Sequence, residues 1–213
     1  MVVTAVQGSI LDPQVEGSEE GTRPLATVLE RVDLGAGAWL DVGRNWVAGS
    51  EAIFERLLET VPWQSERRHM YDRIVDVPRL LRFYESEEPL PDPLLDRCRE
   101  DLNEWYGVEA GGPFVTLGMA RYRDGRDSVA WHGDTIGRAS SEDTLVAVLS
   151  LGAPRRFLLR PRTGGASIRY ELGGGDLLVM GGSCQRTWEH SVPKTARAVG
   201  ERISVQFRQA GVR

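Results

Sequence analysis

The sequence predicts an α+β, mainly β fold: a β-sandwich or jelly roll with N-terminal helices packed on one sheet. Two amphipathic helical patterns lie in the first half of the 213-residue chain. After Gly112 the chain changes to short apolar runs separated by turns that contain glycine. Six such runs within about 95 residues are typical of two packed sheets. A hydrophobic content of 41% is enough for a single core.

The N-terminal half predicts a leader followed by two helices. Residues 1–24 are rich in Gly, Glu and Pro and indicate a loose leader, with one short strand at Val2–Gln7. Glu51–Thr60 is predicted to be helical with Ser50 as its N-cap, because its apolar residues share one face. Three prolines then break the chain, and Pro93–Tyr106 forms a second amphipathic pattern.

Between the two helices the segment Trp63–Tyr84 is charged, contains several aromatic residues and has low periodicity. We expect a substrate lid at about 63–92, a jelly-roll core at about 112–210, and a single domain over 25–213. The strands expected in that core are Phe114–Tyr122, Thr144–Leu151, Arg156–Leu159, Ser167–Leu172, Asp176–Met180 and Arg202–Arg208.

The charge distribution favours a local basic surface on an acidic protein. A net charge of −5 argues against a protein that holds nucleic acid by bulk electrostatics. Between Arg121 and Arg169, however, nine arginines stand against five acids, while residues 85–109 are strongly acidic. The arginines indicate either a positive groove or an ordinary solvated face.

Nothing in the composition predicts export or membrane insertion. No stretch reaches the roughly 18 apolar residues of a membrane helix. Gly17, Glu19 and Glu20 stand where a signal peptide has its apolar core. Cys98 and Cys184 are far apart in sequence and are expected to be free thiols, so we expect a cytoplasmic monomer.

Two of the three histidines can share a metal ion with a carboxylate. His132 and Asp134 are two positions apart, so on an extended segment their side chains point to the same side. His190 follows 56 positions after Asp134. Two histidines and one carboxylate form the facial triad of non-haem iron(II) oxygenases, which leaves positions open for a co-substrate and oxygen. Taken alone, His-x-Asp is a weak signal that fits a histidine held by a nearby aspartate better than a metal site.

The C-terminal run Arg202–Arg208 predicts a strand with two unlike faces. Its apolar face consists of Ile203, Val205 and Phe207, and its polar face of Arg202, Ser204, Gln206 and Arg208. Guanidinium groups match carboxylates in a bidentate fork, so the polar face fits a buried anionic ligand. At about 3.3 Å per residue the two arginine Cα atoms are about 20 Å apart. Either both lean towards one five-carbon diacid, or one holds the diacid and the other serves the metal end.

A series of short motifs runs from about Val77 to Arg208 in a fixed order. It comprises Pro78-Arg79 with Tyr84, Arg121-Tyr122-Arg123-Asp124-Gly125, His132-x-Asp134, Ser150-Leu151-Gly152-Ala153 with Arg156-Phe157, Gly175-Asp176-Leu177-Leu178-Val179-Met180, Trp188-x-His190-x-x-Pro193-Lys194, and Arg202 with Phe207-Arg208. Together the motifs resemble the AlkB family of iron(II)- and 2-oxoglutarate-dependent dioxygenases, especially its branch that acts on nucleic-acid bases.

The resemblance implies a double-stranded β-helix of the jelly-roll type and an oxidative demethylase. It implies Fe(II) bound by the catalytic residues His132, Asp134 and His190. It implies 2-oxoglutarate as co-substrate, held by Tyr122, Arg202 and Arg208 with help from Ser204 and Gln206. With O2, such enzymes hydroxylate the carbon of an N-alkyl group on a base of DNA or RNA. The hydroxylated alkyl group then leaves as an aldehyde. The expected role is repair of alkylation damage.

The resemblance also implies substrate contacts. The basic segment from Arg67 to Arg82, Arg79 included, is expected to border the cleft above the metal. Tyr84 is expected to stack on the target base, and ordinary packing against the sheet is the alternative. Tyr71 lies where some members insert an aromatic wedge into a duplex, with packing as an equal alternative.

Three departures from the family pattern concern the substrate. Ala120 replaces an asparagine that helps to hold the co-substrate. Ile136 lies where members often carry an acidic residue that reads the base edge or lines the pocket. The stretch Glu85–Glu88 is acidic and lacks the aromatic residue of the family's lid, which argues against a grip on duplex DNA. The expected partner is therefore single-stranded DNA or RNA.

Two other functions remain open from the sequence. One is a 2-oxoglutarate-dependent hydroxylase of a protein side chain or small molecule, prompted by the acidic lid and Ile136. The other is a non-catalytic binding protein on the same fold. The intact metal-ligand pattern and the two arginines of the last strand speak against the second.

Overall fold

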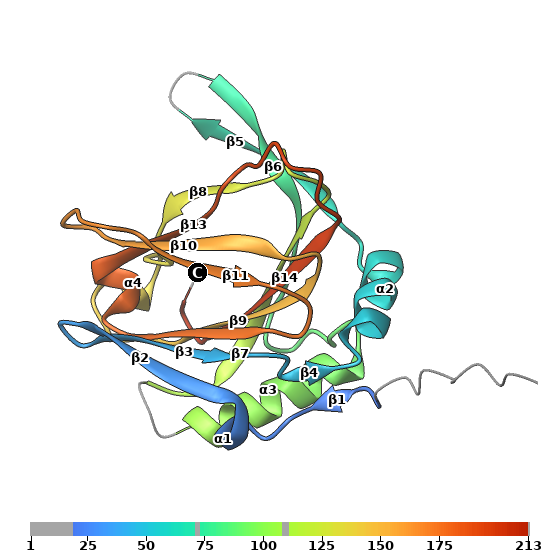
Figure 1. The fold of residues 1–213 in the computed structure, drawn as a ribbon, viewed down its shortest axis with the longest axis horizontal. Coiled ribbons are helices and arrows are strands. Elements are labelled where there is room, and N and C mark those ends of the chain that lie inside the picture. Colours follow the sequence, from blue (N-terminus) through green and yellow to red (C-terminus); the bar gives the residue numbers. More distant parts are fainter. Residues whose placement is uncertain (1–18, 71–72, 108–110, 213) are drawn as a thin grey trace, which may run out of the picture.

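Two β-sheets face each other in the computed structural model, which describes residues 19–70, 73–107 and 111–212 (Figure 1). The larger sheet has eight strands within these residues, in the order β2-β3-β12-β9-β14-β7-β6-β5. Their bounds are Leu29–Gly35 (β2), Ala38–Gly43 (β3), Leu177–Gly182 (β12), Val146–Gly152 (β9), Arg202–Gln209 (β14), Phe114–Tyr122 (β7), Arg73–Tyr84 (β6) and Gln64–Met70 (β5).

The smaller sheet has four strands in the described residues, in the order β11-β10-β13-β8. Their bounds are Ile168–Leu172 (β11), Arg155–Pro161 (β10), Trp188–Val192 (β13) and Val129–His132 (β8). All recorded pairings in the two sheets are antiparallel. The expected jelly roll is confirmed. The six expected strands of the C-terminal half are present with shifted ends, but β8 and β13 were not predicted as strands.

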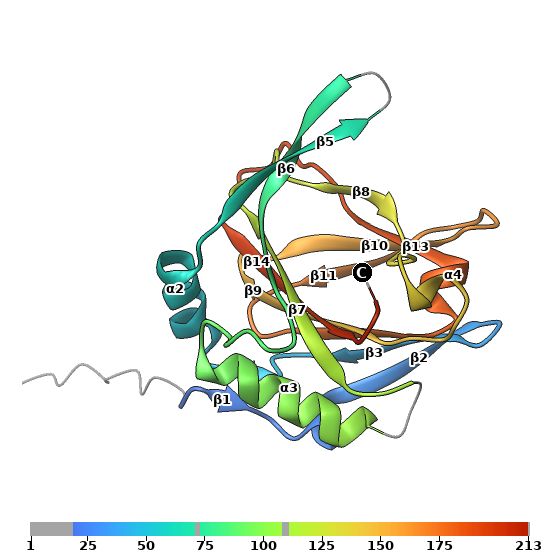
Figure 2. The same ribbon diagram turned by 180° about the vertical axis from the view of Figure 1, so that it is seen from behind.

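The helices α2 (Ser50–Thr60) and α3 (Pro93–Tyr106) cover the outer face of the larger sheet, as Figure 2 shows from behind, and the short α1 (Leu25–Val28) packs on the same side. The short α4 (Cys184–Thr187) and the 3-10 turn Arg138–Ser140 lie on the other face, where Cys184 and Ala139 pack with residues of both sheets. Asp92 caps α3 by accepting a hydrogen bond from the backbone N–H of Leu94, and Pro93 occupies the first turn. The expected N-cap of α2 is wrong by one position: Gly49, with φ 62°, is the cap and Ser50 is already helical.

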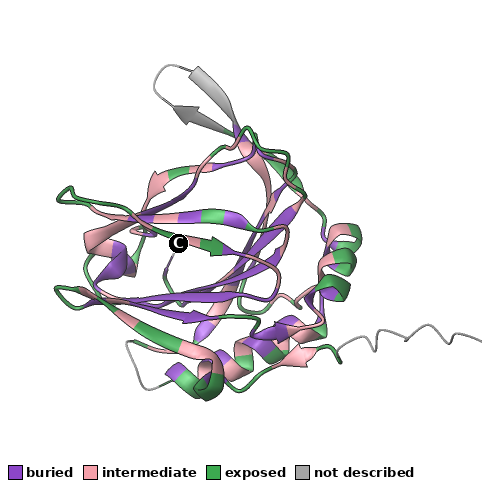
Figure 3. Ribbon diagram, in the orientation of Figure 1, coloured by how far each residue is buried: buried purple, intermediate pink, exposed green. Residues whose placement is uncertain are grey.

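Two apolar cores lie on opposite faces of the larger sheet. The helix-side core packs α2 and α3 against β7, β9 and β14 through residues such as Leu57, Leu102 and Phe207. The inter-sheet core fills the space between the two sheets with residues such as Phe157 and Met180. Figure 3 shows the resulting pattern, with buried positions along the central strands and exposed ones on the outer sides of the helices. We call the face towards the smaller sheet the site face.

A long hairpin replaces the expected segment of low periodicity. β5 and β6 pair with each other, and Leu80–Tyr84 of β6 also pairs with β7 in the larger sheet. The upper part of the hairpin projects beyond the sheets (Figure 1). The expected lid is therefore a sheet extension rather than an irregular loop. The extension forms because β6 pairs with β7. The sequence of the segment has no alternation of apolar residues that would predict this pairing.

The N-terminal boundary also differs from the expectation. β1 (Gly21–Thr22) pairs with β4 (Val47–Ala48), so ordered pairing begins before residue 25. The strand expected at Val2–Gln7 lies outside the described residues.

The cysteines match the sequence prediction, since Cys98 and Cys184 are both free and buried. Among the helices of the described residues, none has the length and apolar character needed to cross a membrane.

Candidate functional site

Three side chains from two neighbouring strands and one loop converge at the edge of the smaller sheet. His132 ends β8, and it pairs directly with His190 of β13, which places the two ring centroids 4.2 Å apart. Asp134 follows two residues after His132. One ligand atom from each of the three residues lies within 4.8 Å of the others. The prediction that these residues are brought together from distant parts of the chain is therefore met by the geometry.

The rings of both histidines are oriented by local contacts. His132 Nδ1 lies 2.8 Å from the carbonyl oxygen of Ala130. Because a carbonyl only accepts, Nδ1 must carry the hydrogen, and Nε2 of the neutral ring then offers its lone pair to a metal. The ring of His190 stacks on Phe157 with centroids 5.4 Å apart. Both imidazoles are thus held before any ligand binds.

Asp134 is buried and held by charge. Arg208 donates from Nε and Nη2 to Asp134 Oδ2, at 3.1 and 3.0 Å. Burial alone raises the pKa of this carboxyl, but the positive charge and the hydrogen bonds of Arg208 oppose it, and the pKa is lowered to about 2. The backbone N–H of Asp134 donates to Oε1 of Gln185 at 2.9 Å. The carboxylate is therefore ionised and fixed at neutral pH.

Metal binding also needs a neutral imidazole, and His190 is held in that state. Burial lowers the pKa of His190 to about 3, and the positive charges of Arg208 and Arg162 act in the same direction, against the carboxylate of Asp134. A neutral imidazole together with an ionised carboxylate is the donor chemistry of a divalent transition-metal site. The residues present therefore fit an iron(II) ion.

A fully buried arginine lies further along the site face of β14. The Nε of Arg202 donates to Ser150 Oγ at 2.9 Å, and its guanidinium lies 5.3 Å from the ring of Tyr122. Its Nη1 is buried and has no hydrogen-bond partner among the described residues. Burial lowers the pKa of Arg202 to about 10, so it stays charged at neutral pH. A buried cation with an open donor fits a carboxylate ligand.

The remaining expected co-substrate residues surround this arginine on β7 and β14. Tyr122 pairs with Arg202 across the strands. Nε2 of Gln206 donates to Oγ of Ser204 at 2.6 Å. Gly118 lies where any side chain would collide with Arg208, since a Cβ there would come within 2.6 Å of Arg208 Nη1. The glycine lets Arg208 cross β7 on its way to Asp134.

The two arginines of β14 have different positions in the site. Arg208 contacts the metal-ligating carboxylate, whereas Arg202 lies towards the other end of the strand beside Tyr122. Of the two arrangements left open by the sequence, the geometry matches the second, in which one arginine serves the metal end.

Of the expected substrate contacts, Tyr84 lies on the other side of the sheet. Tyr84 pairs with Leu117, and both belong to the helix-side core, where Tyr84 is only 4% exposed. A ring buried there is not accessible to a base, so the expected stacking role of Tyr84 is not supported. Side chains alternate along a strand, so its neighbour Phe83, opposite Gly118, lies on the site face together with Leu81.

The other expected substrate contacts have varied surroundings. Arg79 donates to the carbonyl of Ser128 at 3.0 Å and so holds a loop. Ile136 is 68% exposed, two positions after Asp134, and is one of two exposed large hydrophobic residues in the described part of the chain. Tyr71 lies outside the described residues. Glu88 is ion-paired with Arg82, and the guanidinium of Arg82 lies over the ring of Tyr84. The acidic stretch is therefore tied to the helix side of the sheet, where β6 ends.

The sequence interpretation missed three residues that support the site. Gln185 and Ser150 hold Asp134 and Arg202 through the contacts above. Arg155 is 3% exposed and its guanidinium lies 5.5 Å from Tyr122. All three act on partners distant in sequence, and no local pattern identifies them.

Comparison with known proteins places this geometry in a family. Residues 88–208 match the model of the 2OG-Fe(II) oxygenase superfamily. The chain is 31% identical over 182 residues to the alpha-ketoglutarate-dependent dioxygenase alkB homolog 3 of Bos taurus. It is 33% identical over 133 residues to the DNA oxidative demethylase ALKBH2 of Arabidopsis thaliana.

These similarities cover most of this chain but less of its relatives. The bovine alignment covers 75% of this chain and 61% of the relative, and the Arabidopsis alignment covers 52% and 42%. The solved structure of OsALKBH1 superimposes with a TM-score of 0.56 at 13% identity, covering 84% of this chain and 100% of that one. At that identity the superposition supports the fold.

Proposed function

The chain belongs to the 2OG-Fe(II) oxygenase superfamily, and from this membership we propose that it removes alkyl groups from the bases of nucleic acid by oxidation. As a member it is a dioxygenase that uses Fe(II) and 2-oxoglutarate. The finer assignment, oxidative dealkylation of DNA or RNA, rests on its similarity to AlkB homologues, one of which is named a DNA oxidative demethylase.

We assign the metal to His132, Asp134 and His190, and the co-substrate to Arg202 and Tyr122 with Arg208, Ser204 and Gln206. The observation that carries this assignment is the open donor of Arg202, a buried cation on the same strand as the arginine that holds Asp134. Together, bound iron(II) and 2-oxoglutarate activate O2, so that 2-oxoglutarate becomes succinate and CO2 while one oxygen atom hydroxylates the alkyl carbon.

The chain's own residues orient the reactants and exclude water. Arg202 would receive one carboxylate of the diacid, where burial strengthens the charged hydrogen bonds. Arg208 keeps Asp134 ionised by donating to its Oδ2, which leaves Oδ1 of the same carboxylate facing the histidines. Phe157, 4% exposed and stacked on His190, shields that ligand from solvent. Once the alkyl carbon carries a hydroxyl, the carbon–nitrogen bond breaks and the group leaves as an aldehyde.

We propose that the substrate base enters beside Phe83 and Ile136, in single-stranded DNA or RNA. Phe83 supplies an aromatic ring on the site face of β6, and stacking on such rings tolerates every base. Ile136 presents an exposed apolar side chain two residues from Asp134. The acidic stretch Glu85–Glu88, which argues against a grip on duplex DNA, directly follows the end of β6, and its Glu88 is already ion-paired with Arg82.

Succinate formation is the direct test. We expect the protein with Fe(II), 2-oxoglutarate and O2 to form succinate in amounts that increase with an N-methylated single-stranded oligonucleotide and match the aldehyde released. An unmethylated oligonucleotide of the same sequence is the control. Equal succinate with both oligonucleotides would contradict dealkylation.

A hydroxylase of a protein side chain or small molecule is the second candidate, favoured by the exposed apolar Ile136 where family members often read a base with an acid. It predicts succinate formation that nucleic acid does not stimulate.

Tight binding of a duplex in preference to the matching single strand would overturn the strand preference while leaving dealkylation in place.

A further inference from the structure

A groove of about 570 Å³ lies between the lower part of the β5–β6 hairpin and the loop 123–128. The charged residues that line it are Arg67, Arg123, Asp124, Arg126, Asp127 and Lys194. Four cations and two carboxylates give it a net charge of +2, on a chain whose total charge is −5. None of these residues belongs to the metal or co-substrate site.

The two carboxylates of the groove are already neutralised by its arginines. Arg123 donates from Nε and Nη2 to Asp127 at 2.7 and 2.9 Å. Arg126 donates from Nε and Nη2 to Asp124 at 3.0 and 2.6 Å. The side chain of Arg126 is nevertheless 89% exposed, so donors of its guanidinium remain open to solvent. Lys194 is exposed and has no ion pair among the described residues.

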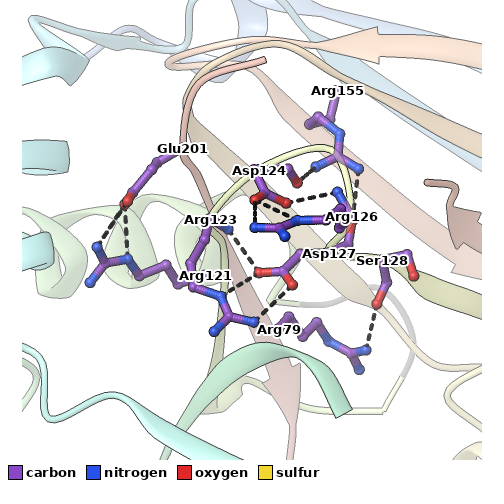
Figure 4. A network of polar contacts seen from close by, with 9 residues as sticks. All are labelled: Arg79, Arg121, Arg123, Asp124, Arg126, Asp127, Ser128, Arg155 and Glu201. Carbon is purple, nitrogen blue, oxygen red and sulfur yellow. Dashed lines mark hydrogen bonds and ion pairs between the residues drawn. The ribbon is translucent and has the colours of Figure 1, made fainter. Parts of the chain in front are cut away.

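One buried guanidinium holds the loop in place (Figure 4). Arg155 donates to the carbonyls of Asp124, Asp127 and Pro193 at 3.0, 2.9 and 2.9 Å. Arg79 ties the end of the loop at Ser128. Because the loop is held at both ends and at its centre, its backbone needs no ordering on binding.

The segment after β13 contributes Lys194 to the groove. The backbone N–H of Thr195 donates to the carbonyl of Gly125 at 2.8 Å. A Cβ at Gly125 would lie 2.3 Å from the carbonyl oxygen of Thr195, so only glycine permits this approach. Lys194 is thereby fixed beside the arginines of the loop.

The groove is connected to the metal ligands by two strands. β8 runs from the loop to His132, and β13 runs from His190 to the segment that carries Lys194; Val129 pairs with Val192 at the groove end. Lys194 is four residues from His190, which corresponds to about 13 Å of extended chain. That length spans about four stacked nucleotides at 3.4 Å each, and fewer in an extended strand.

We propose that this groove binds the phosphodiester backbone of the substrate strand, a few nucleotides from the base at the metal. The inference rests on the proposed function and names a second contact for the same substrate. Arg126 and Lys194 supply the charged donors, and the apolar surface of Val77 and Pro78 in the groove faces the sugars. Contacts of this kind fix the position of the strand and carry no base preference.

The test uses the double variant Arg126→Glu/Lys194→Glu with an unmodified fluorescent ten-nucleotide strand, as DNA and as RNA. We expect anisotropy titrations to show affinity reduced tenfold or more at low salt. Affinity falls as salt rises, and in the neutral double variant Arg126→Gln/Lys194→Gln this dependence should be weaker. The slope of log affinity against log salt should become shallower by about 1.4, since each lost phosphate contact removes about 0.7. Circular dichroism melting establishes that the variants fold.

Arg169→Glu is the matched control, because Arg169 is exposed on β11, at the edge of the smaller sheet opposite β8. It should bind the strand like the unaltered protein apart from a small, uniform effect of net charge. Succinate formation on a trinucleotide methylated at its central base, which extends only one nucleotide to either side and so does not reach the groove, should be unchanged in both double variants.

The outcomes separate the groove from the proposed function. Unchanged affinity and salt slope in folded double variants, with turnover of the methylated trinucleotide intact, would overturn the groove and keep dealkylation. A parent protein that neither binds the strand nor turns over the trinucleotide would overturn both. Stronger binding of polyglutamate than of the ten-nucleotide strand would also reject a phosphodiester track and identify the groove as a site for acidic peptide.

Discussion

The two faces of the larger sheet differ in what they bury. On the helix side, Ile203, Val205 and Phe207 of β14 pack against residues of the same apolar kind. On the site face, one position along, the strand buries Arg202 and Ser204. Because side chains alternate, one strand can contribute both to stability and to ligand binding, and the two contributions are separable by mutation.

The site face is less favourable in the ligand-free protein. A buried donor without a partner, such as Arg202 Nη1, costs on the order of 1–3 kcal/mol. The helix-side core also holds one such donor, Nε1 of Trp46, but the strand β14 contributes only apolar side chains to that core. A bound carboxylate would satisfy this donor, so we expect co-substrate binding to raise the melting temperature.

The largest expected effect is the loss of turnover when a metal ligand is removed. His132→Ala, Asp134→Ala and His190→Ala should each abolish succinate formation, because two remaining ligands hold a labile metal poorly. His132 is partly exposed, so its variant should keep a nearly unchanged melting temperature without metal. Activity like that of the parent in any of the three would reject the ligand assignment.

The opposite face of β14 should show a large effect on stability. Phe207→Ala removes a fully buried ring from the helix-side core and should lower the free energy of unfolding by about 3–5 kcal/mol. Denaturant titration measures this value. The folded fraction should bind 2-oxoglutarate with unchanged affinity; a comparable loss of affinity would show that the two faces are not separable.

Arg202→Met tests the site face of the same strand. It keeps bulk and removes the charged donors, so affinity for 2-oxoglutarate should fall tenfold or more, about 1.5–3 kcal/mol for a charged hydrogen bond. The free energy of unfolding without co-substrate should not fall by a similar amount, because the substitution also removes a buried charge. Titration by melting-temperature shift measures both. Unchanged affinity in both Arg202→Met and Arg208→Met would mean that the polar face serves another ligand.

The difference between the faces also explains which predictions from the sequence succeeded. Pro93–Tyr106 is predicted with its observed bounds, because Asp92, the proline and the apolar stripe are all local signals. The β5–β6 hairpin was missed, because the sequence of Gln64–Met70 is mostly polar and charged and leaves no apolar alternation to detect. Tyr84 was placed on the wrong face because register, which fixes the face, comes from pairing with β7.

The site shows the same division. His132, Asp134 and His190 stand out because histidine is scarce in the chain and the spacing is that of a strand. Gln185 and Ser150 are 51 and 52 positions away from the partners that they hold. Their roles depend on which loop and strand become neighbours, and side-chain type alone does not encode that.

Gln185 tests whether these distant supports matter for the metal. Its Oε1 accepts from the backbone of Asp134, and its Nε2 lies 3.6 Å from the sulfur of Met180. Gln185→Leu removes the acceptor and should weaken metal binding on the order of 10–100-fold. Gln185→Glu keeps an acceptor and should recover part of the loss. Titration with Co(II), followed by its visible absorption, measures both; identical affinities would limit Gln185 to packing.

The smallest expected effect compares neighbours on β6 that occupy opposite faces. Phe83→Leu removes an aromatic ring from the site face and should weaken binding of a methylated single strand about fivefold to tenfold, the lower part of the 1–3 kcal/mol that a base–aromatic stack contributes. Tyr84→Phe keeps its ring in the helix-side core and removes only a hydroxyl, so binding should not change. Melting temperatures of both variants control for packing.

The opposite result would be equally informative about the faces. If Tyr84→Phe weakened binding and Phe83→Leu did not, β6 would have to shift its register by one residue when substrate binds, because a slip of one position exchanges the faces of a strand. Such a slip would break the pairing of Leu80–Tyr84 with β7. Amide hydrogen exchange across these residues, measured with and without oligonucleotide, would detect it. Unchanged protection in the complex would leave Phe83 as the aromatic residue of β6 that meets the base.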